Sequence, residues 1–147
     1  MIHRLRRARR TIILDRREDG PPARCRLRAL RQPVAADQRF AIKIGEHVAP
    51  DKPGKGAGCL EMAGAEDRYT FTATPGTLVY LKAEPPCTEE YIRWEMYDAT
   101  NTLVTYGMTI CRDIGRTLLE KGGSYTIRVF GEKKDATGDY GFTIQRE

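Results

Sequence analysis

The side chains that usually carry hydrolytic chemistry are scarce in this sequence. Its 147 residues include one serine, Ser124, and two histidines, His3 and His47. Ser124 follows two glycines, where a turn residue is expected, and no nucleophile-elbow motif surrounds it. No pair of carboxylates is held at a defined separation by its local sequence, as glycoside hydrolysis requires. We therefore expect no catalytic residues, no enzyme activity and no organic cofactor.

Long apolar runs and paired cysteine motifs are also missing. No stretch approaches the roughly 18 apolar residues of a membrane span. Within residues 1–38 no apolar run is longer than three residues, as at residues 12–14, which is far shorter than the apolar core of about 7–15 residues in a secretory signal. The four cysteines include no C-x-x-C pair, which argues against a zinc knuckle or a thioredoxin-type motif and leaves three complete pairings open.

The net positive charge of the chain comes from its first quarter. Residues 1–39 contain 12 arginines, no lysine and 4 acidic residues, a net charge of +8, whereas the rest of the chain has a net charge of −3. We expect residues 1–38 to be a disordered tail or linker, because they have little apolar surface to bury. The alternative is a basic arm that binds nucleic acid or an anionic surface, although the arm has no aromatic residue on which bases could stack.

From residue 39 onward, polar and apolar residues alternate with a period of two. Segments such as "RFAIKIG", "RYTFTAT" and "YIRWEMYD" read as half-buried strands. Turn signals separate them: Pro75–Gly76, Asn101 and "KGG". Eight or nine short strands without helical periodicity predict an all-β fold for residues 39–147, an antiparallel β-sandwich of two sheets. The predicted core consists of Tyr69, Phe71, Trp94, Ile127, Val129, Phe142 and Ile144.

Four short motifs, in a fixed order, resemble one known family. They are "EDRYTFTATPG", "MYDATNTLV", "GGSYTIRVFG" and "TGDYGFTI". Together they resemble the bacterial pre-peptidase C-terminal domain, a jelly-roll-like β-sandwich, over roughly residues 40–145. Asn101 stands where these domains usually carry glycine, and it preserves the backbone requirement.

This resemblance implies a role for the chain. Such domains are typically non-catalytic appendages of secreted bacterial proteins, often proteases and other hydrolases. We therefore expect an extracellular or cell-surface accessory module that helps to recognise a protein or polysaccharide surface, or that takes part in maturation of a parent hydrolase. The expected partner is that surface or a parent catalytic domain. We expect a monomer that does not bind nucleic acid, unless the basic tail is the binding element.

In this family context, Cys87 and Cys111 are candidates for a disulfide. Cys87 lies 11 residues before Asp98 and Cys111 lies 10 residues after Asn101, so they flank one predicted hairpin at similar distances. A bridge would close a loop of about 25 residues and stabilise the fold by roughly 3 kcal/mol. It would fit an oxidising compartment. The alternative is a pair of buried free thiols.

Calcium is the one metal that the resemblance suggests, because some relatives bind it with acidic residues. The candidates are Glu46, Asp51, Glu66 and Asp67, whose loops could lie at the same end of a sandwich. No D-x-D-x-D-G loop is present, and nearby lysines work against cation binding. We favour turn and capping roles, with Asp67 satisfying free backbone N–H groups just ahead of a strand.

Three tyrosines are candidates for outward-facing contacts. Tyr80, Tyr97 and Tyr106 fall on the outward positions of predicted strands. Outward aromatic rings can stack on sugars or insert at protein interfaces. The alternative, which we favour, is packing at the edges of the sheets beneath loops.

Overall fold

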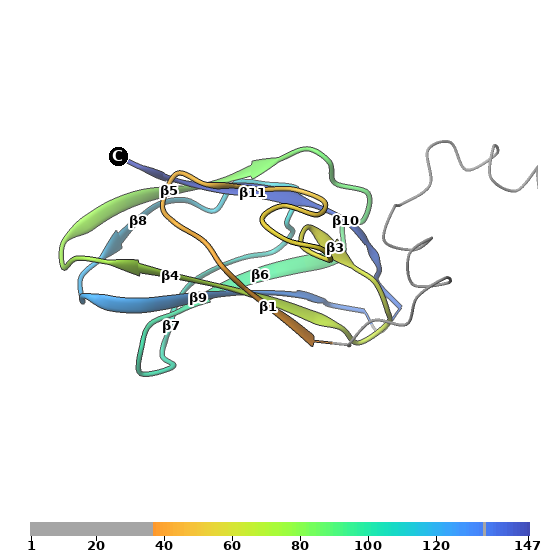
Figure 1. The fold of residues 1–147 in the computed structure, drawn as a ribbon, viewed down its shortest axis with the longest axis horizontal. Coiled ribbons are helices and arrows are strands. Elements are labelled where there is room, and N and C mark those ends of the chain that lie inside the picture. The colour runs from red at the N-terminus through yellow and green to blue at the C-terminus, as the bar shows by residue number, and fades with distance from the viewer. Residues whose placement is uncertain (1–36, 134) are drawn as a thin grey trace, which may run out of the picture.

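The chain folds into two layers of β-sheet. The computed structural model describes residues 37–133 and 135–147, which contain eleven strands and no helix (Figure 1). The predicted all-β sandwich is therefore confirmed. In this part of the chain, nothing resembles a membrane-spanning helix. The first strand begins at Asp37, so nearly all of the predicted tail, residues 1–36, lies outside the described residues.

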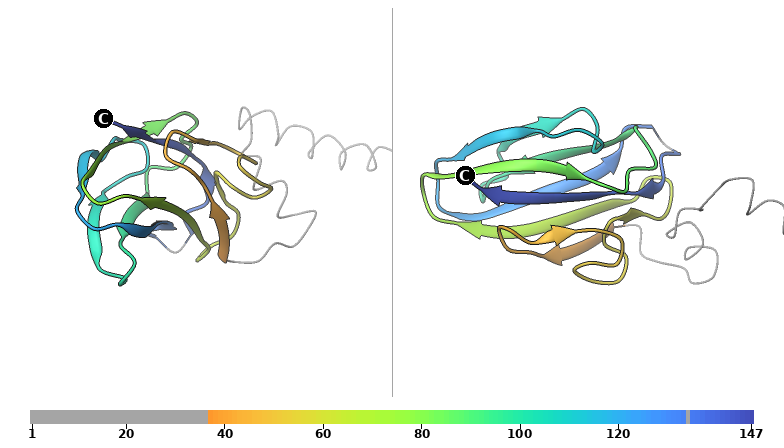
Figure 2. Two further views of the ribbon diagram at one scale, coloured as in Figure 1. Left: turned by 60° about the vertical axis from the view of Figure 1, so that its left-hand side comes forward. Right: turned by 90° about the horizontal axis from the view of Figure 1, so that it is seen from above.

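Two sheets and one short ladder make up the fold. Sheet A has the order β1 (Asp37–Ala41), β4 (Glu66–Ala73), β9 (Gly123–Gly131), β6 (Ile92–Tyr97), β7 (Leu103–Gly107). Sheet B has the order β2 (His47–Val48), β11 (Gly141–Arg146), β5 (Thr77–Glu84), β8 (Gly115–Leu119). The ladder pairs β3 (Cys59–Leu60) with β10 (Gly138–Asp139). Figure 2 shows the two sheets from two further directions.

One strand pair departs from the predicted antiparallel arrangement. β1 runs parallel to β4, with Phe40 opposite Tyr69. Between these strands the chain crosses to sheet B, where it forms β2, and then returns through β3. A parallel pair needs such a crossover. The period-two pattern around residue 40 could not reveal this direction, because it is the same for parallel and antiparallel strands.

The space between the sheets is filled by the predicted core. All seven predicted core side chains are 2% exposed or less. The ring of Phe142, from sheet B, lies 5.2 Å from the ring of Tyr69 and 5.4 Å from that of Trp94, both from sheet A. A Cβ atom at Gly107 would approach the Trp94 indole nitrogen to 2.5 Å, so only glycine leaves room for this ring. Aromatic contacts therefore join the two sheets.

The turns and the disulfide follow the predictions from the sequence. Gly76 has φ = 83° and Asn101 has φ = 67°, as their turns require. Cys87 and Cys111 form a disulfide with their Cα atoms 5.5 Å apart. The bridge joins the segment before β6 to the segment after β7 and so closes the base of this hairpin.

Candidate functional site: the outer face of sheet A

The outer face of sheet A carries a row of charged side chains. Cross-strand pairing places Arg39 beside Arg68, Arg68 beside Arg128, and Arg128 beside Glu95. These four residues come from β1, β4, β9 and β6, which are successive strands of the sheet. Adjacent strands are about 4.8 Å apart. The register therefore brings together charges that are far apart in the sequence.

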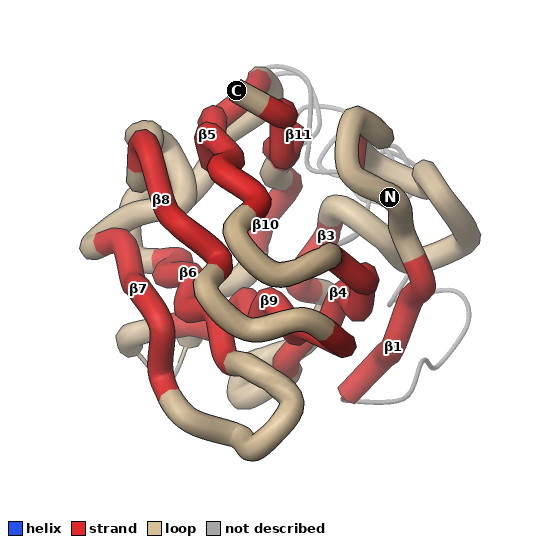
Figure 3. The backbone as a smooth tube through the Cα atoms, turned by 90° about the vertical axis from the view of Figure 1, so that its left-hand side faces the viewer, coloured by secondary structure: helices blue, strands red, loops and turns tan. Residues whose placement is uncertain are grey.

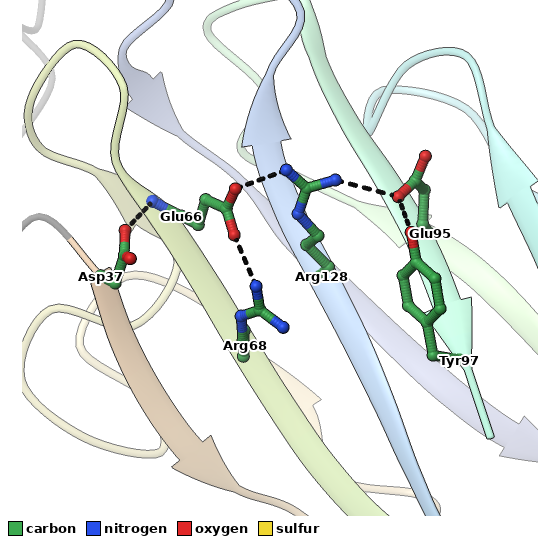
Figure 4. Close-up of polar contacts among 6 residues, drawn as sticks. All are labelled: Asp37, Glu66, Arg68, Glu95, Tyr97 and Arg128. Carbon is green, nitrogen blue, oxygen red and sulfur yellow. Dashed lines mark hydrogen bonds and ion pairs between the residues drawn. The ribbon is translucent and has the colours of Figure 1, made fainter. Parts of the chain in front are cut away.

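Ion pairs join most of this row into one network. Arg68 Nη2 donates to Glu66 Oε1 over 2.9 Å, and Arg128 Nη2 donates to the other oxygen of the same carboxylate. Arg128 Nη1 also donates to Glu95 Oε1 over 3.1 Å. Tyr97 Oη donates to this same Glu95 oxygen over 2.5 Å. Figure 4 shows the network crossing β4, β9 and β6.

The network keeps its groups in their ordinary charged forms. The hydrogen bond from Arg128 lowers the pKa of Glu66, with a further contribution from the charge of that guanidinium. The hydrogen bond to Glu66 likewise raises the pKa of Arg128. The hydrogen bond to Glu95 raises the pKa of Tyr97. At neutral pH the network is therefore a set of fixed charges on a rigid sheet.

Beside the network the face is hollowed. The hollow has a volume of about 430 Å³ and is lined by two guanidinium groups and four hydroxyl groups, from Arg39, Arg68, Thr70, Tyr97, Ser124 and Thr126. Arg39 is exposed, and within residues 37–133 and 135–147 its guanidinium has no hydrogen-bond or ion-pair partner. Such a surface offers hydrogen-bond donors to a ligand rich in oxygen, such as a carboxylate or a sugar hydroxyl.

The rim of the hollow is a rigid turn at residues 98–101. Asp98 Oδ1 accepts hydrogen bonds from the N–H groups of Thr100 and Thr102, over 2.9 and 3.0 Å. The Thr100 hydroxyl donates to the same oxygen over 2.7 Å. This hydroxyl bond is the main reason that the pKa of Asp98 falls to about 2. The rim therefore keeps its shape and its negative charge over a wide pH range.

A second polar cluster lies on the inner face of the same strand, β4. Tyr140 Oη donates to Asp67 Oδ2 over 2.6 Å and lies 2.6 Å from Tyr69 Oη. The Gly58 N–H donates to Tyr69 Oη over 2.9 Å. Asp67 is only 1% exposed, and burial raises its pKa to about 8. This cluster is closed to ligands, so we assign it a structural role.

The predicted calcium ligands lie in different settings. Glu66 and Asp67 are inside β4, where successive side chains point to opposite faces of the sheet. The expectation that both lie in a turn ahead of the strand is therefore wrong. The reason is that β4 begins two residues earlier than "RYTF" suggests.

The other two candidates do cap their loops. Glu46 Oε1 accepts a hydrogen bond from the Lys43 N–H over 3.0 Å. Asp51 Oδ1 accepts one from the Gly56 N–H over 3.1 Å. Across residues 37–133 and 135–147, no three or more histidine, cysteine, aspartate or glutamate side chains form a group that could hold a metal ion. Calcium binding stays a prediction.

Sequence reasoning missed Arg39, Arg68 and Arg128 as members of a site. The alternating pattern does place Arg68 and Arg128 on the polar faces of their strands, and that signal was available. Their alignment depends on strand order and register, which the pattern does not contain. Ser124 and His47, which a serine hydrolase would need together, lie in different sheets.

The outward tyrosines have different surroundings. Tyr97 belongs to the ion-pair network. Tyr80 Oη donates to Asp113 Oδ2 over 2.8 Å, on sheet B. Tyr106, on β7, is 53% exposed, and the Arg93 guanidinium lies 5.9 Å from the centre of its ring. Packing beneath loops is therefore wrong for Tyr106.

Comparison with known proteins supports the fold. No family model matches the chain, and no curated protein matches its sequence. Several solved structures are similar to it, among them the following three. A periplasmic inhibitor of g-type lysozyme, PliG of Aeromonas hydrophila, aligns with 76% of this chain and 99% of its own, at 10% identity and a TM-score of 0.53.

The other two structures give comparable agreement. The pre-peptidase C-terminal domain of Bacillus anthracis collagenase aligns with 74% of this chain and 96% of its own, at 17% identity and a TM-score of 0.51. PliG of Salmonella Typhimurium, also a periplasmic inhibitor of g-type lysozyme, aligns with 75% and 99%, at 15% identity and a TM-score of 0.51. The fold is therefore a β-sandwich like that of the pre-peptidase C-terminal domain, and the resemblance seen in the sequence is confirmed for the fold.

Proposed function

We propose that this chain is a non-catalytic recognition module of an exported bacterial protein and that it binds its target through the outer face of sheet A. The observation that carries this proposal is the hollow beside the ion-pair network. It presents a set of hydroxyl groups and the guanidinium of Arg39, which has no partner among the residues that the structure describes, on a rigid sheet. Groups that are already in place lose little entropy when a ligand binds.

The chemistry of the hollow favours a target with exposed oxygen atoms. Guanidinium groups bind carboxylates in a fork-like geometry, and hydroxyl groups can both donate and accept hydrogen bonds. Acidic side chains on a protein surface and the hydroxyl or carboxylate groups of a polysaccharide both meet this description. The target we propose is a protein or polysaccharide surface, which includes the surface of a parent catalytic domain.

The structural neighbours and the disulfide support an exported module. One neighbour is a domain of a collagenase, and two are periplasmic inhibitors of g-type lysozyme. From these neighbours we propose for this chain only a general role, that of a β-sandwich that acts alongside another protein. The Cys87–Cys111 disulfide suits an oxidising compartment, so we propose a periplasmic or extracellular location.

A binding panel with matched variants tests this proposal. Fibrillar collagen and a g-type lysozyme are chosen from the neighbours, and polygalacturonate is chosen for its carboxylates. The test variant is Arg39→Ala, and the control is Arg146→Ala, which removes an exposed arginine from sheet B. We expect binding to at least one probe, weakened about tenfold by Arg39→Ala and unchanged by Arg146→Ala. Binding to no probe, or equal effects of both variants, would contradict the proposal.

The basic tail supplies a second candidate function. The net charge of +8 in residues 1–39 favours contact with a polyanion. This function predicts binding to single-stranded DNA that weakens steeply with added salt and is lost when residues 1–36 are deleted. The first proposal predicts that the same deletion leaves binding to the panel unchanged.

A further inference from the structure

The exposed apolar side chains of the molecule gather on one of its sides. The strand orders place β7 at one end of sheet A and β8 at the corresponding end of sheet B, with β1 and β2 at the opposite ends. Figure 3 shows β7 and β8 on one side and β1 on the other. The described residues expose six large apolar or aromatic side chains, and four of these are on the β7–β8 side: Leu103 (46%), Tyr106 (53%), Met108 (63%) and Leu118 (50%).

β7 is also an edge strand without protection. Its one strand partner among residues 37–133 and 135–147 is β6, so the backbone N–H and C=O groups on its other side are available for a further strand. Edge strands are usually protected by charged residues, prolines or short length. Residues 103–108, "LVTYGM", contain no charge and no proline.

The other edges do show such protection. β1 carries Asp37 and Arg39, β8 carries Arg116, and β2 has only two residues. An edge that is neutral, apolar and unpaired fits the addition of another strand by backbone hydrogen bonding. The contrast with the protected edges indicates that β7 is the place where such an addition occurs.

We propose that β7 pairs with β7 of a second copy of this chain, antiparallel and across a two-fold axis. The two ends of the strand carry opposite net charges, so the edge is complementary to a second copy of itself. Near the start of β7 a hollow is lined by two carboxylates and one ammonium group, from Asp98, Glu120 and Lys121, which leaves one net negative charge.

The other end of β7 carries the opposite charge. Arg112 and Asp113 line a second hollow beside Tyr106 and Met108, and the Arg93 guanidinium faces the ring of Tyr106. Two guanidinium groups and one carboxylate leave one net positive charge. An antiparallel two-fold pair brings the negative end of each copy to the positive end of the other. A parallel pair would bring like charges together.

Pairing of this kind would have two consequences. It would cover Leu103, Tyr106 and Met108, which are otherwise exposed to water. It would also join the five strands of sheet A from each copy into one continuous sheet. The hollow beside the ion-pair network of one copy would then lie on the same surface as that of the other copy. A target with repeated groups could then be held at two points, which raises the effective affinity.

Sedimentation velocity across a concentration series tests the pairing. We expect the full chain to shift from monomer to dimer below about 1 mM. The variant Leu103→Lys adds a charge to the edge and should raise the dimer dissociation constant roughly tenfold or more. Met108→Lys is a second test variant, and Met62→Lys is the matched control, because Met62 is an exposed methionine in the segment between β3 and β4.

The possible results separate clearly. Dimers that weaken in Leu103→Lys and Met108→Lys, but not in Met62→Lys, would support pairing through β7. Circular dichroism and melting temperature establish that each variant is folded. A chain that stays monomeric up to about 1 mM would overturn the proposal, and so would a dimer that neither test variant weakens. A β7 edge that pairs only with a different protein would also appear as the monomeric result.

Discussion

The two faces of sheet A shift the pKa values of two neighbouring carboxylates in opposite directions. Glu66 and Asp67 are adjacent in β4, but one points outward and the other inward. Glu66 meets two guanidinium groups, and its pKa is lowered. Asp67 accepts a hydrogen bond from a tyrosine hydroxyl in the buried interior, and burial raises its pKa to about 8. The difference shows that the partner and the local dielectric decide the ionisation of each side chain, whereas residue type alone does not.

The inner face should be the more sensitive of the two to truncation. Trp94→Ala removes a fully buried ring from the inner face of β6, and we expect it to lower the free energy of unfolding by about 3–5 kcal/mol. Its neighbour Arg93 points outward, and Arg93→Ala should cost less than about 1 kcal/mol. Urea denaturation of both variants measures the contrast. Similar losses for the two would contradict the assignment of the faces.

Both faces depend on the β6–β7 hairpin, whose base is closed by the disulfide. Replacing Cys87 and Cys111 with serine opens a loop with a sequence separation of 24. We expect a loss of about 3 kcal/mol in unfolding free energy, because the unfolded chain gains conformational freedom. Melting of the natural protein and the double variant measures this loss. If the two melted at the same temperature, the bridge would contribute nothing to stability.

The buried carboxylate should make the protein less stable as pH rises. Folded Asp67 keeps its proton up to about pH 8, whereas its ordinary pKa in the unfolded chain is 3.8. The stabilisation is therefore full below about pH 4 and is lost as pH rises to about 8. Asp67→Asn removes this titration, so its stability relative to the natural protein should increase by about 2 kcal/mol between about pH 5 and about pH 6.5.

Unfolding free energies of both proteins, measured across this pH range, test whether Asp67 titrates there. Several ionisable groups act on Asp67: Glu61 and Asp37 raise its pKa by charge, and the hydroxyl of Tyr140 lowers it. The variant comparison isolates Asp67 because these groups are present in both proteins. A constant difference between Asp67→Asn and the natural protein over the whole range would show that Asp67 does not titrate there.

The outer carboxylate should respond to pH in the opposite sense. The pKa of folded Glu66 lies below its ordinary value of 4.5, so its stabilisation is present above that pH and is lost as pH falls further. Glu66→Gln should cost about 1 kcal/mol at pH 7, since the ion pairs are partly exposed. The cost should shrink below about pH 4 and in high salt. A cost that grows toward low pH would reverse the sign and refute the assignment.

Prediction from the sequence succeeded wherever the evidence is local. The seven core residues, the turns at Gly76 and Asn101 and the β-sandwich were all recognised from alternation and turn chemistry. The parallel direction of β1 was missed because the pattern is the same in both directions. The placement of Asp67 was missed because β4 begins two residues earlier than the pattern suggests, so this carboxylate enters the core and does not cap a turn.

The candidate site depended more strongly on long-range structure. Arg39, Arg68 and Arg128 are separated by dozens of residues, and each alone reads as an ordinary exposed arginine. The register of β1, β4 and β9 places them in one row. The unprotected edge of β7 is a similar case, because its neutral sequence has no special meaning until strand order places it at the end of a sheet.

By itself, the sequence determined which side chains face the core, since the alternation of polar and apolar residues requires each strand to bury one side. Only the tertiary structure decided which strands are neighbours, which edge remains open and which charges share a partner. The physical reason is that hydrophobic burial depends on pattern and little on direction, whereas hydrogen bonds and ion pairs require particular atoms at short range. The residues of the inner face could therefore be predicted from the sequence, whereas the arrangement of charges on the outer face could not.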